Sequence, residues 1–253
     1  MPFSSFARRS AAAAGGLLAV VLLSACQVSI AVGVDAKADG SGVVRATVTL
    51  DKAAADEAGD LSGRLRVDDL QQAGWRVDGP TRTKDGGQEV QASKRFATPV
   101  EATAIVEELS GANGPFREFK LGRSRSFLKT KTTFSGRVDL ARGLGSFSDD
   151  ELRQRLGSDL GFDPAELEGR LGRTLSRVFP VKVVTRLPGA MESNAPLTAD
   201  NGAQWSPTFG ENVVLTASAE KWNRGNIAAA VVAALGFVVL LAWAGRRLYV
   251  RKR

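Results

Sequence analysis

The strongest constraint on the fold of this chain is an apolar segment near the C-terminal end of the sequence. Residues 227–244 include no charged side chain. As a helix, this segment would span about 27 Å, enough to cross the hydrocarbon core of a bilayer. A helix lying in the interface would carry a charged face, and this segment has none. We therefore predict a transmembrane helix at residues 227–245, and we expect the basic tail at 246–253 to stay on the cytoplasmic side.

The positive net charge belongs to the membrane flanks and not to the region between them. The chain has 34 basic and 27 acidic residues and a formal net charge of +7. Seven of the basic residues flank apolar segments, namely Arg8, Arg9, Arg246, Arg247, Arg251, Lys252 and Arg253. Subtracting these seven leaves 27 basic against 27 acidic residues, so the middle of the chain is neutral. We predict no nucleic-acid partner for it.

Two residue types that support much of enzyme chemistry are scarce in the sequence. The chain has no histidine, which excludes Ser-His-Asp and Cys-His catalysis and histidine metal sites. Its single cysteine permits neither an internal disulfide nor a thiolate cluster for zinc. The acidic pairs lack the ligand spacing of a calcium loop. We therefore predict a protein that is not an enzyme and has neither a cofactor nor a metal site.

The N-terminal segment has the pattern of a lipoprotein signal peptide. Arg8 and Arg9 precede an apolar run at 11–23, which is too short for a comfortable membrane span. The run ends in Leu23-Ser24-Ala25-Cys26, which looks like a bacterial lipobox. We predict a signal peptide at 1–26 and a lipid on Cys26; an ordinary signal peptide with a chance cysteine is the alternative. The domain at 27–222 would then lie outside the plasma membrane, lipid-anchored at one end and single-pass at the other.

Periodicity between these ends predicts an α+β domain of mostly antiparallel hairpins packed with helices, followed by the transmembrane helix. Alternating apolar residues separated by turn residues predict two hairpins, one at 28–50 and one at 75–96. Residues 116–140 read as a long pair of strands with a kink near Ser135-Gly136, and further strands are expected at 178–187 and 213–219. Helices are expected from Asp51 towards Gly74, from Pro99 to Gly111, and as a repeated pair within 147–172.

One cationic stripe is a candidate binding surface. If residues 121–134 are extended, alternate side chains share a face, which brings together Arg123, Arg125, Phe127, Lys129, Lys131 and Thr133. Arginine and lysine can bind phosphate, so an anionic lipid headgroup is a suitable partner. The alternatives are a solvated sheet face and a charged edge that prevents strand pairing.

Two tryptophans have two interpretations each, and one asparagine has a single expected role. Trp75 and Trp205 either line an apolar acyl or sugar site or belong to the core. Asn194 follows Pro188-Gly189 at a short distance, and its side chain is expected to close a turn.

Several short motifs, taken in order, resemble the LppM domain family of actinobacterial envelope lipoproteins. They are the lipobox Cys26 followed by a hairpin, Leu70 with Gly74-Trp75-Arg76-Val77, Phe96 with Pro99 and Glu101, Val138-Asp139-Leu140, Leu187-Pro188-Gly189, Ser193-Asn194, Trp205 and the C-terminal span. The resemblance covers nearly the whole mature chain. It implies a non-enzymatic α+β domain held at the membrane surface and associated with phosphatidylinositol-mannoside-type glycolipids. The alternative function is a scaffold module that binds another protein of the cell envelope. A third class is an enzyme that uses carboxylates or a Ser-Lys pair, but the spacing of these residues in the sequence identifies no such pair.

Overall fold

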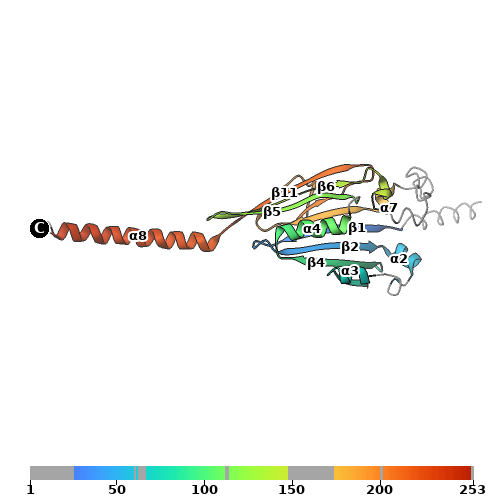
Figure 1. Ribbon diagram of the computed structural model, residues 1–253, viewed down its shortest axis with the longest axis horizontal. Coiled ribbons are helices and arrows are strands. Elements are labelled where there is room, and N and C mark those ends of the chain that lie inside the picture. Colours follow the sequence, from blue (N-terminus) through green and yellow to red (C-terminus); the bar gives the residue numbers. More distant parts are fainter. Residues whose placement is uncertain are drawn as a thin grey trace, which may run out of the picture.

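The computed structural model describes residues 26–59, 61, 67–111, 114–147, 174–199 and 202–251, which form a two-sheet domain followed by a long helix (Figure 1). The helices are α2 (Lys52–Ala58), α3 (Asp68–Gln72), α4 (Pro99–Ser110), a 3-10 helix η1 (Gly143–Phe147), α7 (Leu175–Val178) and α8 (Arg224–Arg251). The class is α+β, as predicted.

A seven-stranded sheet forms one layer of the domain. Its strands, in spatial order, are β3 (Arg76–Arg82), β4 (Gln88–Phe96), β2 (Gly42–Leu50), β1 (Val28–Ala36), β7 (Val181–Arg186), β10 (Gly202–Trp205) and β9 (Leu197–Ala199). β1 and β7 pair in parallel, and the other neighbours pair antiparallel. Both predicted hairpins, β1–β2 and β3–β4, are confirmed.

A four-stranded antiparallel sheet forms the second layer. Its order is β5 (Phe116–Arg125), β6 (Lys129–Asp139), β11 (Asn212–Trp222) and β8 (Ala190–Ser193). The register between β5 and β6 shifts between Arg117 and Lys120, opposite the predicted kink. Gly136 allows the close approach there, because a Cβ at this position would lie 2.8 Å from the ring of Phe119.

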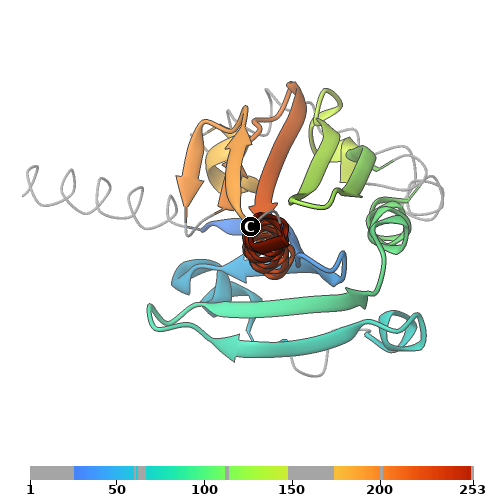
Figure 2. The ribbon, with the colours of Figure 1, turned by 90° about the vertical axis from the view of Figure 1, so that its left-hand side faces the viewer.

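The inner faces of the two sheets and one side of α4 form a single core. Val44, Val138 and Leu215, one from each of three strands, are fully buried. The centre of the Phe134 ring lies 5.5 Å from that of Phe119 and 6.0 Å from that of Trp205. Because Trp205 belongs to the seven-stranded sheet and Phe134 to the four-stranded sheet, this contact joins the two sheets. Figure 2 shows α4 beside the gap between the sheets, where Ala102, Ile105 and Val106 turn into the core.

The ends of α4 follow from its sequence. The Thr98 hydroxyl accepts a hydrogen bond from Glu101 N at 3.3 Å, and the Glu101 carboxylate accepts one from Ala97 N at 2.8 Å. Pro99 occupies the first turn, and Gly111 ends the helix at a φ of 68°. This is a capping box followed by a glycine stop, as predicted.

Where the structure describes the stretch from Asp51 to Gly74, which leaves out residues 60 and 62–66, the expected helix is divided into two short helices. Asp51 caps α2, as predicted, by accepting a hydrogen bond from Ala54 N at 2.8 Å. The helix stops at Gly59, which has a φ of 69°, and α3 covers only residues 68–72. Glycine ends the first helix because it adopts positive φ without steric penalty. The repeated helix pair at 147–172 stays a prediction, because all but Phe147 lies outside the described residues.

The predicted membrane span lies within α8, which begins three residues before it. An 18-residue window from Arg224 to Leu241 has a mean hydropathy of 2.0, and none of it is buried against the domain. Figure 1 shows α8 leaving one end of the domain along its long axis. The C-terminal helix is therefore both long enough and apolar enough to cross a membrane.

The two predicted anchors lie at opposite ends of the domain. Val28 pairs with Leu50, which is followed by α2, at the end farthest from α8 (Figure 1). One residue, Gln27, separates exposed Cys26 from β1. At the other end of β1, Ala38 O accepts a hydrogen bond from Arg123 Nε, near the start of α8. The nine residues of β1 correspond to about 30 Å between these ends.

Two phenylalanines of the β5–β6 hairpin provide a matched test of the core. Phe134 is 3% exposed and packs between Phe119 and Trp205, whereas Phe127 is 61% exposed. We expect Phe134→Ala to lower the free energy of unfolding by about 3–5 kcal/mol, because it leaves a cavity. Phe127→Ala should leave the free energy of unfolding nearly unchanged. Urea unfolding of residues 27–222, followed by tryptophan fluorescence, measures both; equal losses would contradict this description of the core.

Candidate functional site

The predicted cationic stripe does not share one face of the sheet. Three residues, 126–128, separate β5 from β6, and the strands pair Arg123 with Thr132 and Arg125 with Thr130. Between Lys120 and Arg125, odd-numbered residues of β5 therefore share a face with even-numbered residues of β6. Arg123 and Arg125 lie on one face, while Lys129 and Lys131 lie on the other. The prediction was wrong because it treated 121–134 as one strand, and the turn at 126–128 reverses the chain.

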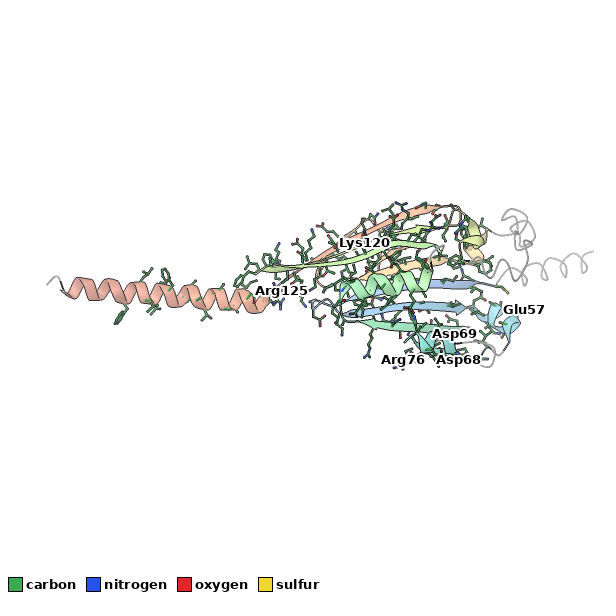
Figure 3. The ribbon with its side chains drawn as sticks, viewed as in Figure 1. Glu57, Asp68, Asp69, Arg76, Lys120 and Arg125 are labelled. Carbon is green, nitrogen blue, oxygen red and sulfur yellow. The ribbon has the colours of Figure 1, made fainter. Side chains whose placement is uncertain are left out.

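The stripe residues have different surroundings as a result. Arg123 Nε donates to Ala38 O at 2.9 Å, and Thr130 and Thr132 beside the arginines are buried. Figure 3 places Arg125 beside the start of α8, whereas Glu57 lies at the opposite end of the domain. Phe127 projects from the turn itself. The role of these residues in binding a ligand stays a prediction.

On the outer face of the hairpin, Lys129 organises a small cluster. Its Nζ lies 2.9 Å from the Glu220 carboxylate and 4.4 Å from the centre of the Trp222 ring. The hydrogen bond from Lys129, followed by the charges of Lys129 and Lys131, lowers the pKa of Glu220 from its usual value. Glu220 therefore partly neutralises the charge of Lys129, and the Lys129 ammonium group lies over the Trp222 ring.

The two tryptophans considered as ligand-lining residues lie in the core. Trp75 is 3% exposed, and its indole Nε1 donates to Glu108 Oε1 at 2.8 Å. Trp205 is 2% exposed, and its Nε1 donates to Asn194 Oδ1 at 3.0 Å. This burial favours the core interpretation, because neither ring offers an open surface.

Asn194 has a different role from the expected closure of its own turn. Its Oδ1 accepts from both Trp205 Nε1 and Thr216 N, at 3.0 and 2.9 Å, and its Nδ2 donates to Val214 O at 2.8 Å. The side chain thus ties β11 to the buried indole of β10. Local turn chemistry could not predict these partners, because they come from other strands.

Trp75, Lys94 and Glu108 form a cluster that the sequence analysis missed. Lys94 Nζ lies 2.7 Å from both the Glu108 carboxylate and Ala73 O, and 5.8 Å from the centre of the Trp75 ring. The hydrogen bond from Lys94 is the main cause that lowers the pKa of Glu108. Desolvation opposes it, and the hydrogen bond from the Trp75 indole and the charge of Lys94 lower the pKa further. The cluster fixes α4 against β4.

Next to this cluster lies an open groove of about 1160 Å³. It covers parts of β2, β3 and β4 and reaches the β1–β2 turn, at the end of the domain from which α8 leaves. Five basic residues and two acidic ones line it: Lys37, Arg45, Arg76, Lys94, Arg95, Asp78 and Glu101.

Not all of this charge is available to a ligand. Arg45 pairs with Asp35, Arg76 with Asp78 and Lys94 with Glu108. Lys37 and Arg95 are exposed and have no ion-pair partner among the residues that the structure describes. Among the described residues, these two side chains are therefore the cations of the groove outside ion pairs, although the charge of Lys37 also acts on the nearby Asp39 carboxyl and lowers its pKa.

The interior offers a second, much smaller space between α4 and the two sheets. It is lined by Val34, Ala102, Val106, Phe119 and Phe134, among others, and has a volume of about 10 Å³. This is about the room that one water molecule needs. It does not accommodate an acyl chain. Among the described residues, no group of three or more Cys, Asp or Glu side chains is arranged to hold a metal ion.

No family model and no curated protein matches the chain. Among solved structures, the chain is similar to the folded domain of Mycobacterium tuberculosis LppM, determined by NMR. The similarity covers 79% of this chain and 93% of that chain, with 16% sequence identity and a TM-score of 0.41. LppM is the protein whose family the motifs of this sequence resemble. At this identity the likeness concerns the fold alone.

The Glu108 cluster predicts a specific loss of stability in acid. Because the folded-state pKa of Glu108 lies below the ordinary value of 4.5, the carboxylate stabilises the fold fully above that pH. This stabilisation is lost as the pH falls through the lowered folded-state pKa. We expect Glu108→Gln to reduce the fall in melting temperature between pH 6 and pH 3. The neighbouring exposed Glu107→Gln is the control, and an equal reduction in both variants would contradict the assignment.

Proposed function

We propose that this chain is a non-catalytic, membrane-anchored domain of the cell envelope that binds the anionic headgroup of a lipid or glycolipid, of the phosphatidylinositol-mannoside type, at the outer face of the plasma membrane. The observation that carries the proposal is the basic groove. It opens at the same end of the domain as the apolar helix α8, so a ligand in it would come from the membrane surface.

The charges of the groove suit a phosphate. Lys37 and Arg95 can bind it, and the guanidinium of Arg95 can donate two parallel hydrogen bonds to one phosphate group. The paired side chains of Arg45, Arg76 and Asp78 offer further donors and acceptors for sugar hydroxyls. A polar, open groove of this size is suited to a headgroup more than to a lipid tail.

The tight packing of the core also favours a headgroup over a lipid tail as the ligand. The interior space of about 10 Å³ has no room for an acyl chain, so the tails of a bound lipid would stay in the bilayer. The domain would then hold or present a lipid by its headgroup, without extracting it. Transfer of a whole lipid would need the core to open, which disrupts the contacts of Phe134 with Phe119 and Trp205.

Two substitutions in the groove test the proposal. Lys37→Gln with Arg95→Gln removes these two cations. Each basic residue near an anionic surface contributes about 1 kcal/mol, so we expect about 30-fold weaker binding of residues 27–222 to phosphatidylinositol-mannoside vesicles. Sedimentation with vesicles at constant ionic strength measures the affinity.

A matched double variant controls for the change in net charge. Arg82→Gln with Lys84→Gln also removes two exposed cations, but at the β3–β4 turn on the far end of the domain. This variant should bind as the unaltered domain does. An equal loss in both variants would show that charge alone causes adsorption. Absence of binding to any vesicle, from a folded domain, would favour the protein-scaffold alternative.

The two anchors are part of the proposal and can be tested separately. We expect acylation of Cys26, visible as added mass in the intact protein and abolished by Cys26→Ser. A chain that ends at residue 222 should stay in the membrane fraction through this lipid. The same truncation combined with Cys26→Ser should be released. Recovery of the truncated chain with intact Cys26 in the soluble fraction, at its unmodified mass, would contradict lipidation.

A further inference from the structure

The turn between β5 and β6 exposes apolar side chains beside the start of α8. We call residues Ser126, Phe127 and Leu128 the tip. Phe127 is 61% exposed and Leu128 46%, and Trp222 at the end of β11 is 54% exposed. Figure 1 shows the β5–β6 hairpin reaching past the rest of the domain towards the first turn of α8. Three large apolar side chains therefore face solvent around one helix end.

Two asparagines at the start of α8 hold the tip. Asn223 Nδ2 donates to Ser126 O at 2.9 Å, and Asn226 Nδ2 donates to Phe127 O at 2.7 Å. Asn223 N donates to Leu128 O at 2.8 Å. All three carbonyls of the tip are thus hydrogen-bonded to α8 or to the residue before it.

These hydrogen bonds fix the position of the tip along the axis of α8. Asn226 directly precedes Ile227, the first residue of the uncharged run. Phe127 O is bonded to the Asn226 side chain, so Phe127 lies at the level where α8 enters its apolar segment. If α8 crosses a bilayer, the tip is at the interface of that bilayer.

The chemistry of the tip suits that depth. An unpaired carbonyl is costly near hydrocarbon, and the carbonyls of the tip are paired. Aromatic rings such as those of Phe127 and Trp222 bury apolar area at the interface, and tryptophan is enriched there. Four exposed cations surround the tip: Arg125, Lys131, Lys221 and Arg224. None of them forms an ion pair among the described residues, although the charge of Lys131 acts on Glu220. The four cations lie where lipid phosphates would be.

We propose that the tip and Trp222 form a membrane-inserted collar around the first turn of α8, and that its occupant is the lipid of the bilayer that α8 crosses. The collar fixes the domain to the helix, so that the domain cannot rotate freely on a flexible stalk. The inference rests on the proposed membrane insertion of α8 and goes beyond headgroup binding in the groove.

A depth measurement on the full chain tests the collar. The chain's single cysteine is replaced by Cys26→Ser, and Phe127→Cys then carries a nitroxide label in vesicles of phosphatidylcholine and phosphatidylglycerol. We expect the label at 127 to lose accessibility to a water-soluble nickel reagent and to gain accessibility to oxygen. Phe127 is largely exposed, so the substitution should not disturb folding.

Two label positions distinguish the possible failures. Val214→Cys, 53% exposed on β11 and paired with Arg137 away from the tip, should remain accessible to the nickel reagent. Leu235→Cys lies within α8 and reports insertion of the helix. A label at 235 in the bilayer with a label at 127 in water would overturn the collar and leave the anchor intact. A label at 235 in water would overturn the membrane anchor itself.

A further variant tests the asparagine contacts. Asn226→Ala removes the donor to Phe127 O, and we expect the label at 127 to regain accessibility to the nickel reagent while the label at 235 stays in the bilayer. An unchanged depth at 127 would overturn the positioning role of Asn226. A label at 127 shielded from both reagents would show a second copy of the chain over the tip and would overturn lipid as its occupant.

Discussion

Burial of the facing sides of two sheets is the interaction on which the rest of the structure depends. Val44, Val138 and Leu215 are fully buried, and Phe134 links the aromatic groups of both layers. The seven-stranded sheet alone would expose one apolar face, and so would the four-stranded sheet. The side chain of Asn194 adds a polar tie between β10 and β11, where the two layers meet.

Filling the core in this way leaves the ends and outer faces of the strands for function. Within the part of the chain that the structure describes, the space between α4 and the sheets has room for about one water molecule, whereas the basic groove beside β4 is open and far larger. The groove and the collar lie at the same end of the domain. The hydrogen bond from Arg123 to Ala38 joins the two regions, because it ties the β5–β6 hairpin to the β1–β2 turn that borders the groove. A rigid hairpin on α8 would thus hold the groove at a constant height above the lipid.

Local sequence signals predicted those elements whose stability is itself local. Alternation of apolar residues predicted the β1–β2 hairpin, and the Thr98–Glu101 box predicted the start of α4, because hydrogen bonds within four residues decide that start. Alternation also predicts faces, but only within one strand. The stripe failed at the turn, where the pairing of Arg125 with Thr130 puts residues of opposite parity on one face.

The site features that were missed depend on long-range contacts. Lys94 and Glu108 are 14 residues apart, and Trp75 is 33 residues from Glu108, so no spacing rule connects the three. The groove likewise draws residues from three strands, the β1–β2 turn and the first turn of α4. Asn223 and Asn226 read as ordinary polar residues before an apolar helix, and their partners in the tip are nearly a hundred residues away in the sequence.

The position of Cys26 constrains how the two proposed anchors can work together. With α8 along the bilayer normal, the collar is at the surface and the start of β1 stands about 30 Å above it. A lipid on Cys26 cannot span this distance, because Gln27 alone separates it from β1. Both anchors can occupy one bilayer only if the domain leans towards the surface. Because α8 continues along the long axis of the domain (Figure 1), leaning would bend the chain at the collar and strain the hydrogen bonds from Asn223 and Asn226 to the tip. Tilt of α8, which transmembrane helices tolerate, supplies part of the lean. Removing either anchor should therefore change the orientation of the domain more than its attachment to the membrane.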